Sequence, residues 1–444
     1  TCNVYNMIKF ARALFALDPQ MRYADFHERA LFNHILGSMD PADGATCYMV
    51  PVGQGVAREY QDMERDFTCC VGSGMESHAL HGDGLYYGSA DTLWVNIYAP
   101  STADWVETGV RLKMATSFPE GKEATLTIET KKPRRFEIAL RRPYWAGEGF
   151  AVKVNGKGVK DVGPAGSYVR VGRKWKTGDK VELTLPKSLR LEPLPDNPDR
   201  AAILWGPLVL AGDLGPLPER RPRGSGGTGA TPRPQRPTTP ALVTVEASPA
   251  AWIEPVDGRP GTFKTGGVGR DRDVELVPFY RLHRRIYAAY WDILTPRKWE
   301  ERAAAMKAAQ EAREKLEAAT VAFVQPGQMQ TERDFNQRGG TTTPVQSQGR
   351  YGRRAADWFS FDVPVDPASP LSLVVTYGRD ERADRSFAVL IDGRKVGEER
   401  IARRSPQEKE GFFDVAYPIP AESVAGKDKV TVRFEGTDGR ETGT

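Results

Sequence analysis

Apolar positions follow a helical period at the start of the chain and an alternating period after about residue 93. In residues 1–17 and again in residues 21–36, apolar side chains recur at the three- and four-residue spacing of an amphipathic helix. Asp18 and Pro19 end the first of these segments. Two successive helices without a strand between them predict the end of a helical domain. A shorter helix is expected to begin at Gly74, in GMESHALHG.

From residue 93 onward, apolar and polar residues alternate in short runs, which is the pattern of half-buried strands. Asn155-Gly156 and residues 177–179 (TGD) are typical of β-hairpin turns. Seven or more such runs within about 120 residues predict a β-sandwich. The runs are TLWVNIYAPS, VRLKMATSF, ATLTIET, RFEIALRRP, AVKVNG, YVRVGRKW and KVELTLP.

Two further segments separate the strand-rich parts. Residues 215–240 are rich in Pro, Gly, Thr and Arg, which predicts a disordered linker or loop. No aromatic residue lies among its arginines, which disfavours a nucleic-acid patch. Residues 298–320 form a charged, Ala-rich helical pattern, and strand patterns return over residues 335–434.

We therefore expect a mixed α and β multidomain protein. The expected parts are the end of an α/α domain, a β-sandwich, a disordered linker or loop, the remainder of the β-sandwich region, a helical spacer, and a second β-sandwich for which carbohydrate binding is one interpretation. Their expected bounds are residues 1–92, 93–213, 214–241, 242–296, 297–324 and 325–444.

Composition narrows the functional classes. The 62 basic and 58 acidic residues nearly cancel to a formal net charge of +4, which gives no support for a nucleic-acid or membrane-surface partner. The longest apolar stretches, such as residues 201–212, are too short to span a bilayer. Four cysteines in 444 residues exclude a disulfide scaffold.

The clearest chemical signal is the segment DFTCCVGSGMESHALHGDG, residues 66–84. Cys69 and Cys70 are adjacent, so a disulfide between them is strained. Together with Cys2 they are candidate zinc ligands, and a following helix N-terminus favours a lowered thiol pKa. The spacing is not that of a CxxC knuckle, so three buried thiols are the alternative interpretation. Cys47 has no cysteine neighbour and is expected in the core.

Four other residues have competing interpretations. Glu76 suits a capping or dipole role in the first turn of the expected helix. His78 and His81 are either metal or substrate contacts or satisfied hydrogen-bonding residues. Glu28 is either an exposed helix carboxylate paired with a neighbouring base or a group that points into the helical domain's cavity.

The order of several motifs resembles glycoside hydrolase family 127 and the related family 146, over about residues 1–291. The motifs are TCNVYNM, FHERALFNHIL, TCCVGSGMESHALHGDGLYY, RRPYWAG, LRLEPLPDNPDRAAILWGPLVLAG and PFYRLHRRIYAAYW. The resemblance implies a β-L-arabinofuranosidase in which an (α/α)6 barrel is followed by β-sandwich domains. Arabinose-containing oligosaccharides or polysaccharides would be its substrates.

The resemblance also implies roles for individual residues. Zinc would be held by a glutamate together with Cys2, Cys69 and Cys70, and Cys69 would be the nucleophile of a retaining mechanism. Glu28 and Tyr48 match positions that contact the sugar.

The chain departs from the family pattern at its start. The zinc-ligand glutamate would directly precede Thr1, and the general acid/base glutamate would lie further upstream. We therefore expect a C-terminal piece of a longer, secreted or periplasmic protein, inactive as the isolated chain. Residues 215–240 are an insertion that the family does not lead us to expect.

Two other functional classes compete with the glycosidase hypothesis. A non-catalytic carbohydrate-binding or scaffolding protein would use the two sandwiches, but it has no need of three converging thiols. A thiol redox protein is disfavoured because the sequence contains no CxxC. Zinc content distinguishes the glycosidase from the carbohydrate-binding protein, because only the glycosidase requires the metal.

Overall fold

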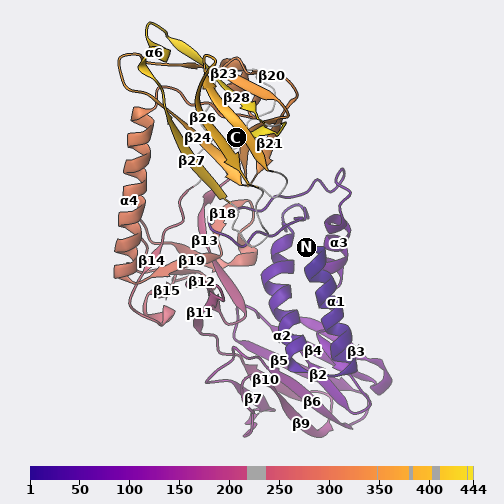
Figure 1. Cartoon of the computed structure of the whole chain (residues 1–444). Helices are drawn as coiled ribbons and strands as arrows, with labels where there is room; N and C mark the ends of the chain where they lie inside the picture. Colours follow the sequence, from indigo (N-terminus) through magenta and orange to yellow (C-terminus); the bar gives the residue numbers. More distant parts are fainter. Residues whose placement is uncertain (218–236, 348, 380–383, 403–410, 438, 444) are drawn as a thin grey trace. The chain divides into compact units, whose positions relative to one another are not determined.

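A computed structural model describes residues 1–217, 237–347, 349–379, 384–402, 411–437 and 439–443 (Figure 1). The chain divides into two compact units, Thr1–Ala303 and Ala304–Thr444. Helices come first and strands dominate the rest, which confirms the predicted mixed α and β multidomain class. Most of the predicted linker, residues 214–241, falls on residues 218–236, which lie outside the described residues.

The first unit begins with two helices. Helix α1 spans Cys2–Leu17 and buries Tyr5, Ile8, Ala11 and Phe15, as the apolar period predicts. Helix α2 spans Met21–Ala30 and continues as a π-helical turn, Leu31–Ile35, and a 3-10 turn, Leu36–Ser38. None of the described helices has both the length and the apolar composition that crossing a membrane requires.

Helix α3, Cys69–Ala79, begins five residues earlier than predicted. Thr68 is its N-cap, and its hydroxyl accepts a hydrogen bond from Gln61 Nε2 at 2.5 Å. The glycines that suggested a turn lie inside the helix. At Gly74 a Cβ atom would lie 2.4 Å from the Thr46 side chain, so glycine serves close packing here rather than a turn.

The strand-rich part that follows is a sandwich of two sheets with one core between them. One sheet has the order β1 (Tyr86–Gly88), β2 (Thr92–Val95), β6 (Arg134–Arg142), β9 (Ser167–Trp175). The other has the order β3 (Ser101–Trp105), β4 (Val110–Thr116), β5 (Glu123–Thr130), β10 (Lys180–Thr184), β7 (Ala151–Val154), β8 (Lys157–Gly158). All seven predicted strands are present, because alternation reports the buried face of each.

The two predicted hairpin turns have different outcomes. Asn155 and Gly156, with φ of 51° and 78°, join the paired strands β7 and β8, which confirms the first. Residues 177–179 join β9 to β10, and these strands belong to different sheets, so the second prediction is wrong. A turn signal fixes a change of direction but not the strand's partner.

A third β-region in the same unit forms a nine-stranded sheet with its own core around Ile203, Leu276 and Trp291. Strands before residue 213 pair with strands after residue 242, so segments on both sides of the predicted linker belong to one sheet. Its main path is β14 (Leu242–Val243), β19 (Tyr290–Leu294), β12 (Asn197–Trp205), β13 (Leu208–Pro216), β17 (Glu275–Pro278), β16 (Phe263–Thr265), β15 (Ile253–Pro255). Strand β11 (Leu189–Leu194) pairs with β12, and β18 (Arg285–Ala288) pairs with β13.

Helix α4, Pro296–Ala319, confirms the predicted charged helix. In the second unit, rings such as Phe359, Phe387 and Phe434 form a separate core. Its sheets have the orders β20 (Arg338–Gly339), β23 (Trp358–Pro364), β28 (Lys429–Gly436), β25 (Arg385–Ile391), β26 (Arg394–Ile401); β21 (Thr342–Ser347), β22 (Arg350–Ala355), β29 (Thr442–Gly443); and β24 (Ser372–Arg379), β27 (Gly411–Pro418). The short helices α5 (Met329–Asp334) and α6 (Ala421–Val424) complete it, and 3-10 turns elsewhere span Val106–Thr108, Pro249–Ala251 and Phe279–Arg281.

A buried cation joins α2 to the sandwich. Arg141, on β6, is fully buried and forms ion pairs with Glu28 and with Asp25, the latter at 2.7 Å. Trp145 Nε1 donates to the other oxygen of Glu28 at 2.7 Å. These contacts fix the helices on the sandwich, since a buried charge without its partner is costly.

We predict that Arg141→Met lowers the free energy of unfolding by about 3–5 kcal/mol, because Glu28 keeps a buried charge without a partner. Urea unfolding followed by circular dichroism measures this change. Arg111→Met is the matched control: its pair with Asp104 is exposed, and the unfolding midpoint should not move. Equal midpoints for the two variants would contradict the proposed role of Arg141.

Candidate metal centre

Three thiols converge from two helices that are far apart in the sequence. Cys2 is the first residue of α1, and Cys69 and Cys70 are the first two residues of α3. The Sγ atoms of Cys2 and Cys69 lie 3.3 Å apart, and those of Cys69 and Cys70 lie 3.9 Å apart. All three sulfur atoms lie within 4.8 Å of one another. Figure 1 shows the N-terminus of α1 beside α3.

The backbone of residues 46–48 lies between the two helix starts and holds them in place. Tyr48 O accepts hydrogen bonds from the Thr1 nitrogen at 2.8 Å and from the Cys70 thiol at 3.6 Å. Thr1 Oγ1 donates to Cys47 O at 2.6 Å, and Thr46 Oγ1 donates to Cys70 O at 3.4 Å. The positions of the sulfur atoms therefore follow from ordinary backbone and side-chain contacts.

Exposure differs among the three cysteines. Cys70 is buried, Cys2 is partly exposed, and Cys69 is exposed to solvent. Only Cys69 therefore presents its sulfur fully to a ligand from outside. Cys47 is fully buried and its sulfur is not a member of the group, as expected for a core residue.

The pKa of the Cys69 thiol is raised, whereas a helix N-terminus favours a lowered thiol pKa. Its hydrogen bond with the Cys2 thiol, together with that to Cys70, raises the pKa of Cys69 to about 11. Without a cation the exposed sulfur is therefore a neutral thiol at physiological pH. A thiolate at this position requires an additional positive charge.

The donor set fits a zinc ion. Zinc binds thiolates at about 2.3 Å, and the sulfur atoms at two corners of a tetrahedron of that size lie about 3.8 Å apart. The measured separations of 3.3 and 3.9 Å are close to this value. Within the part of the chain that the structure describes, the group contains these three cysteines and no carboxylate, so a fourth ligand has to come from elsewhere.

The two predicted sugar contacts are placed differently. The Tyr48 side chain is about half exposed, and the backbone carbonyl of the same residue accepts a hydrogen bond from the Cys70 thiol. Glu28 is only 1% exposed, and its two oxygens are bonded to Arg141 and Trp145. Both Glu28 oxygens thus accept hydrogen bonds inside the protein, and the contact of Glu28 with a sugar stays a prediction. The motif gave its position in the chain but not its partners, which lie more than 100 residues away.

The other candidates of the cysteine-rich segment do not join the metal centre. Glu76 lies in the middle of α3 and pairs with Lys9 at 3.6 Å, so the capping interpretation is wrong because the helix begins earlier. His78 Nδ1 and His81 Nε2 share a hydrogen bond of 3.0 Å. Their contacts favour the satisfied hydrogen-bonding interpretation for these two nitrogens.

One buried polar residue between the helices, His27, was not among the residues singled out from the sequence. It lies on α2 and lines a small cavity between the helices with Arg12, Ser77 and His81. Burial, and after it the positive charge of Arg12, lower the pKa of His27 to about 3. Its place on the apolar face of α2 was the available signal.

Four family models match successive parts of the chain. The model described as β-L-arabinofuranosidase, GH127 catalytic domain, matches residues 1–83, and the GH127 middle domain matches residues 92–187. A domain of unknown function matches residues 190–293, and a family of unknown function matches residues 315–444. No curated protein matches the chain.

Several solved structures are similar to the chain. A GH127 β-L-arabinofuranosidase from Geobacillus stearothermophilus T6 is 19% identical, with a TM-score of 0.48 over 65% of this chain and 49% of that one. Another GH127 β-arabinofuranosidase is 20% identical, with a TM-score of 0.49 over 66% of this chain and 50% of that one. A structure named glycoside hydrolase is 18% identical, with a TM-score of 0.49 over 66% and 52%. The chain thus spans about half the length of these structures.

We predict that His27 makes folding sensitive to acid. In the folded protein it stays neutral down to about pH 3, whereas in the unfolded chain it takes up a proton below its ordinary pKa of about 6.5. The unfolded state therefore binds more protons, and the free energy of unfolding falls as the pH drops from 7 toward 4, by up to about 1.4 kcal/mol per pH unit.

Urea unfolding at pH 7.0, 6.0 and 5.0 tests this prediction. His27→Gln removes the titrating group, so its free energy of unfolding should fall less steeply with decreasing pH than that of the unsubstituted protein. Identical slopes would show that another group causes the acid sensitivity.

Proposed function

The chain belongs to glycoside hydrolase family 127, and from this membership we propose that the protein is a glycosidase that hydrolyses β-L-arabinofuranosyl bonds in arabinose-containing glycans. We further propose that Cys2, Cys69 and Cys70 hold zinc and that Cys69 is the nucleophile. The observation that supports this most directly is the convergence of three sulfur atoms within 4.8 Å of one another.

Each cysteine suits a different part of this role. Cys70 is buried, and its thiol donates a hydrogen bond to the Tyr48 carbonyl. It is therefore suited to be a metal ligand and is not accessible to a substrate. Cys2 is partly exposed and lies 3.3 Å from Cys69. Cys69 is the exposed member, so its sulfur is the one that can reach an anomeric carbon.

Zinc, when bound, supplies the positive charge that keeps the sulfur atoms deprotonated. This matters most at Cys69, whose pKa of about 11 leaves it a thiol in the absence of a cation. The two helix N-termini that meet at the cluster add partial positive charge in the same direction.

The proposed reaction has two displacements. In the first, the Cys69 sulfur donates an electron pair to the anomeric carbon, and the bond from that carbon to the leaving oxygen breaks as the oxygen takes a proton from a general acid. In the second, water attacks the same carbon, loses a proton to the conjugate base, and displaces the sulfur. Two inversions at one carbon leave the sugar's configuration retained.

Tyr48 is proposed as a sugar contact. The backbone carbonyl of Tyr48 accepts a hydrogen bond from the thiol of Cys70, the residue next to the proposed nucleophile. The Tyr48 side chain is about half exposed. The aromatic ring offers an apolar face and a hydroxyl, the two features by which a protein binds a sugar ring.

We predict about one zinc ion per chain in protein purified without chelators, measured by inductively coupled plasma mass spectrometry. Cys2→Ser and Cys70→Ser should each weaken zinc binding by at least about tenfold, because a soft thiolate ligand is lost. Cys47→Ser is the matched control, since its sulfur lies outside the cluster, and its zinc content should be unchanged. Zinc-free protein, or equal loss in all three variants, would reject the metal centre.

We also predict that hydrolysis of methyl β-L-arabinofuranoside by the native protein releases the β-anomer first, as two displacements at one carbon require. Proton NMR during the first minutes of reaction distinguishes the two anomers. Cys69→Ala should abolish this reaction, whereas Cys47→Ser should retain it. An initial α-anomer would exclude a covalent sulfur-linked intermediate.

A further inference from the structure

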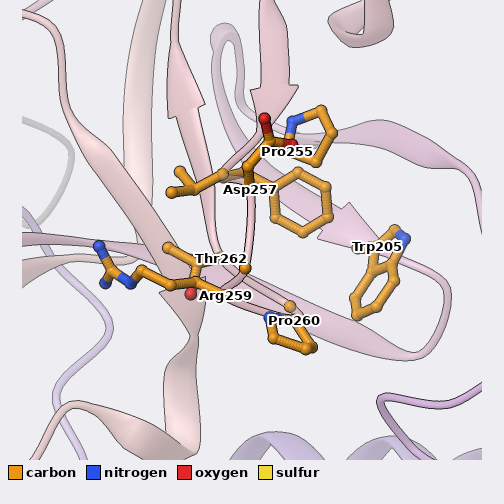
Figure 2. A pocket seen from close by; sticks show the side chains of 10 residues that line it. Trp205, Pro255, Asp257, Arg259, Pro260 and Thr262 are labelled. Carbon is orange, nitrogen blue, oxygen red and sulfur yellow. The ribbon is translucent and has the colours of Figure 1, made fainter.

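One cavity lies far along the chain from the cysteines, in the third β-region. It has a volume of about 480 Å³ and is lined by Trp205 and by residues 255–263. Figure 2 shows the indole of Trp205 on one side and the loop that carries Asp257 and Pro260 on the other. A volume of this size accommodates one or two sugar rings.

The loop is rigid before any ligand arrives. Its backbone is closed by hydrogen bonds from Val256 N to Thr262 O at 2.9 Å and from Thr262 N to Arg259 O at 3.0 Å. Arg259 reaches β17 through a two-bond ion pair with Glu275, at 2.5 and 2.6 Å. Arg281 Nη1 donates to Pro260 O at 3.1 Å. A loop fixed in this way loses little conformational entropy when it binds a ligand.

Trp205 is also held in position. Lys187 Nζ lies 4.0 Å from the centre of its ring, and Phe263 packs edge-on at 5.2 Å between ring centres. Within the described residues, the indole N–H of Trp205 has no hydrogen-bond partner, and it is not among the buried polar atoms. The pocket is thus lined on one side by an aromatic ring that is held in a fixed position.

The charges at the pocket favour a neutral ligand. Arg259 is neutralised by Glu275, and Lys187 Nζ donates to the carbonyls of residues 119, 120 and 121. Asp257 is exposed and no other described residue pairs with its carboxylate. An available carboxylate repels phosphate and carboxylate ligands, but it accepts hydrogen bonds from hydroxyl groups.

We propose that this pocket is a non-catalytic saccharide-binding subsite, in which a sugar ring packs on Trp205 while its hydroxyls donate to Asp257. A sugar combines an apolar C–H face with surrounding hydroxyl donors, which matches the aromatic surface and the carboxylate. The choice of an arabinose-containing glycan as ligand rests on the proposed function. The subsite would hold a polymeric substrate near the enzyme without taking part in bond cleavage.

The indole N–H resonance of Trp205 provides a direct test. The native protein carrying Cys69→Ala, to prevent hydrolysis, is labelled with ¹⁵N and titrated with methyl β-L-arabinofuranoside and with linear arabinan oligosaccharides. Trp205→Phe identifies the resonance by its disappearance. We expect this signal to shift saturably with added sugar.

Asp257→Asn should weaken the binding read from this resonance about 5- to 10-fold, because one charge-assisted hydrogen bond is lost. Asp196→Asn is the matched control, an exposed aspartate outside the pocket, and should bind as the parent does. Both substitutions lie on exposed loops, so neither depends on repacking the core.

The outcomes separate this inference from the proposed function. If the native enzyme hydrolyses the arabinoside but the Trp205 signal does not move, or if Asp257→Asn binds like Asp196→Asn, the subsite is rejected and the glycosidase proposal stands. If the signal shifts and Asp257→Asn weakens the effect while no hydrolysis occurs, the subsite stands and the glycosidase proposal fails.

Discussion

The buried guanidinium of Arg141 is the interaction on which the placement of the helices depends. It has no exposed surface, so its charge has to be balanced inside the protein, and Asp25 and Glu28 of α2 supply that balance. The requirement is mutual, because Glu28 is equally buried. Helix α2 is thereby tied to the sandwich, and α1 and α3, which pack on the same helical segment, take their positions from it. The three cysteines are the first residues of α1 and α3.

The cluster of three cysteines is therefore a consequence of how helix ends are positioned. Backbone contacts of residues 46–48 bring Cys2 and Cys70 together, and Gly74 lets α3 approach Thr46 closely enough for this. The sulfur atoms reach near-tetrahedral separations through protein contacts alone. A site assembled in advance spends less binding free energy on ordering its ligands, which leaves more for holding the metal. The close contacts of Cys69 with the Cys2 and Cys70 thiols also explain why the pKa of Cys69 is high in the absence of a cation.

The sequence predicted local features well and long-range partners poorly. The apolar period located α1, α2 and the strands, since each side chain reports the buried face of its own element. The strand after residues 177–179, the sheet that contains β12 and the contacts of Glu28 depend on residues far away in the chain. Residue type alone made Cys2, Cys69 and Cys70 candidate zinc ligands, but their separate roles came from the resemblance, because no ligand spacing joins residue 2 to residue 69. The start of α3 was misplaced because glycine serves both turns and close helix packing.

The two proposed sites divide the work of glycan hydrolysis according to the chemistry of each. A thiolate nucleophile has to lie where positive charge is concentrated, at two helix N-termini and beside a metal. Holding a long, neutral saccharide needs the opposite: a fixed aromatic ring and hydroxyl acceptors with the surrounding cations already neutralised, as at Trp205 and Asp257. Placing the two sites on separate parts of the fold lets each set of requirements be met independently. A weak subsite is sufficient for this purpose, since a polymer that is held at one point stays at a high local concentration around the nucleophile.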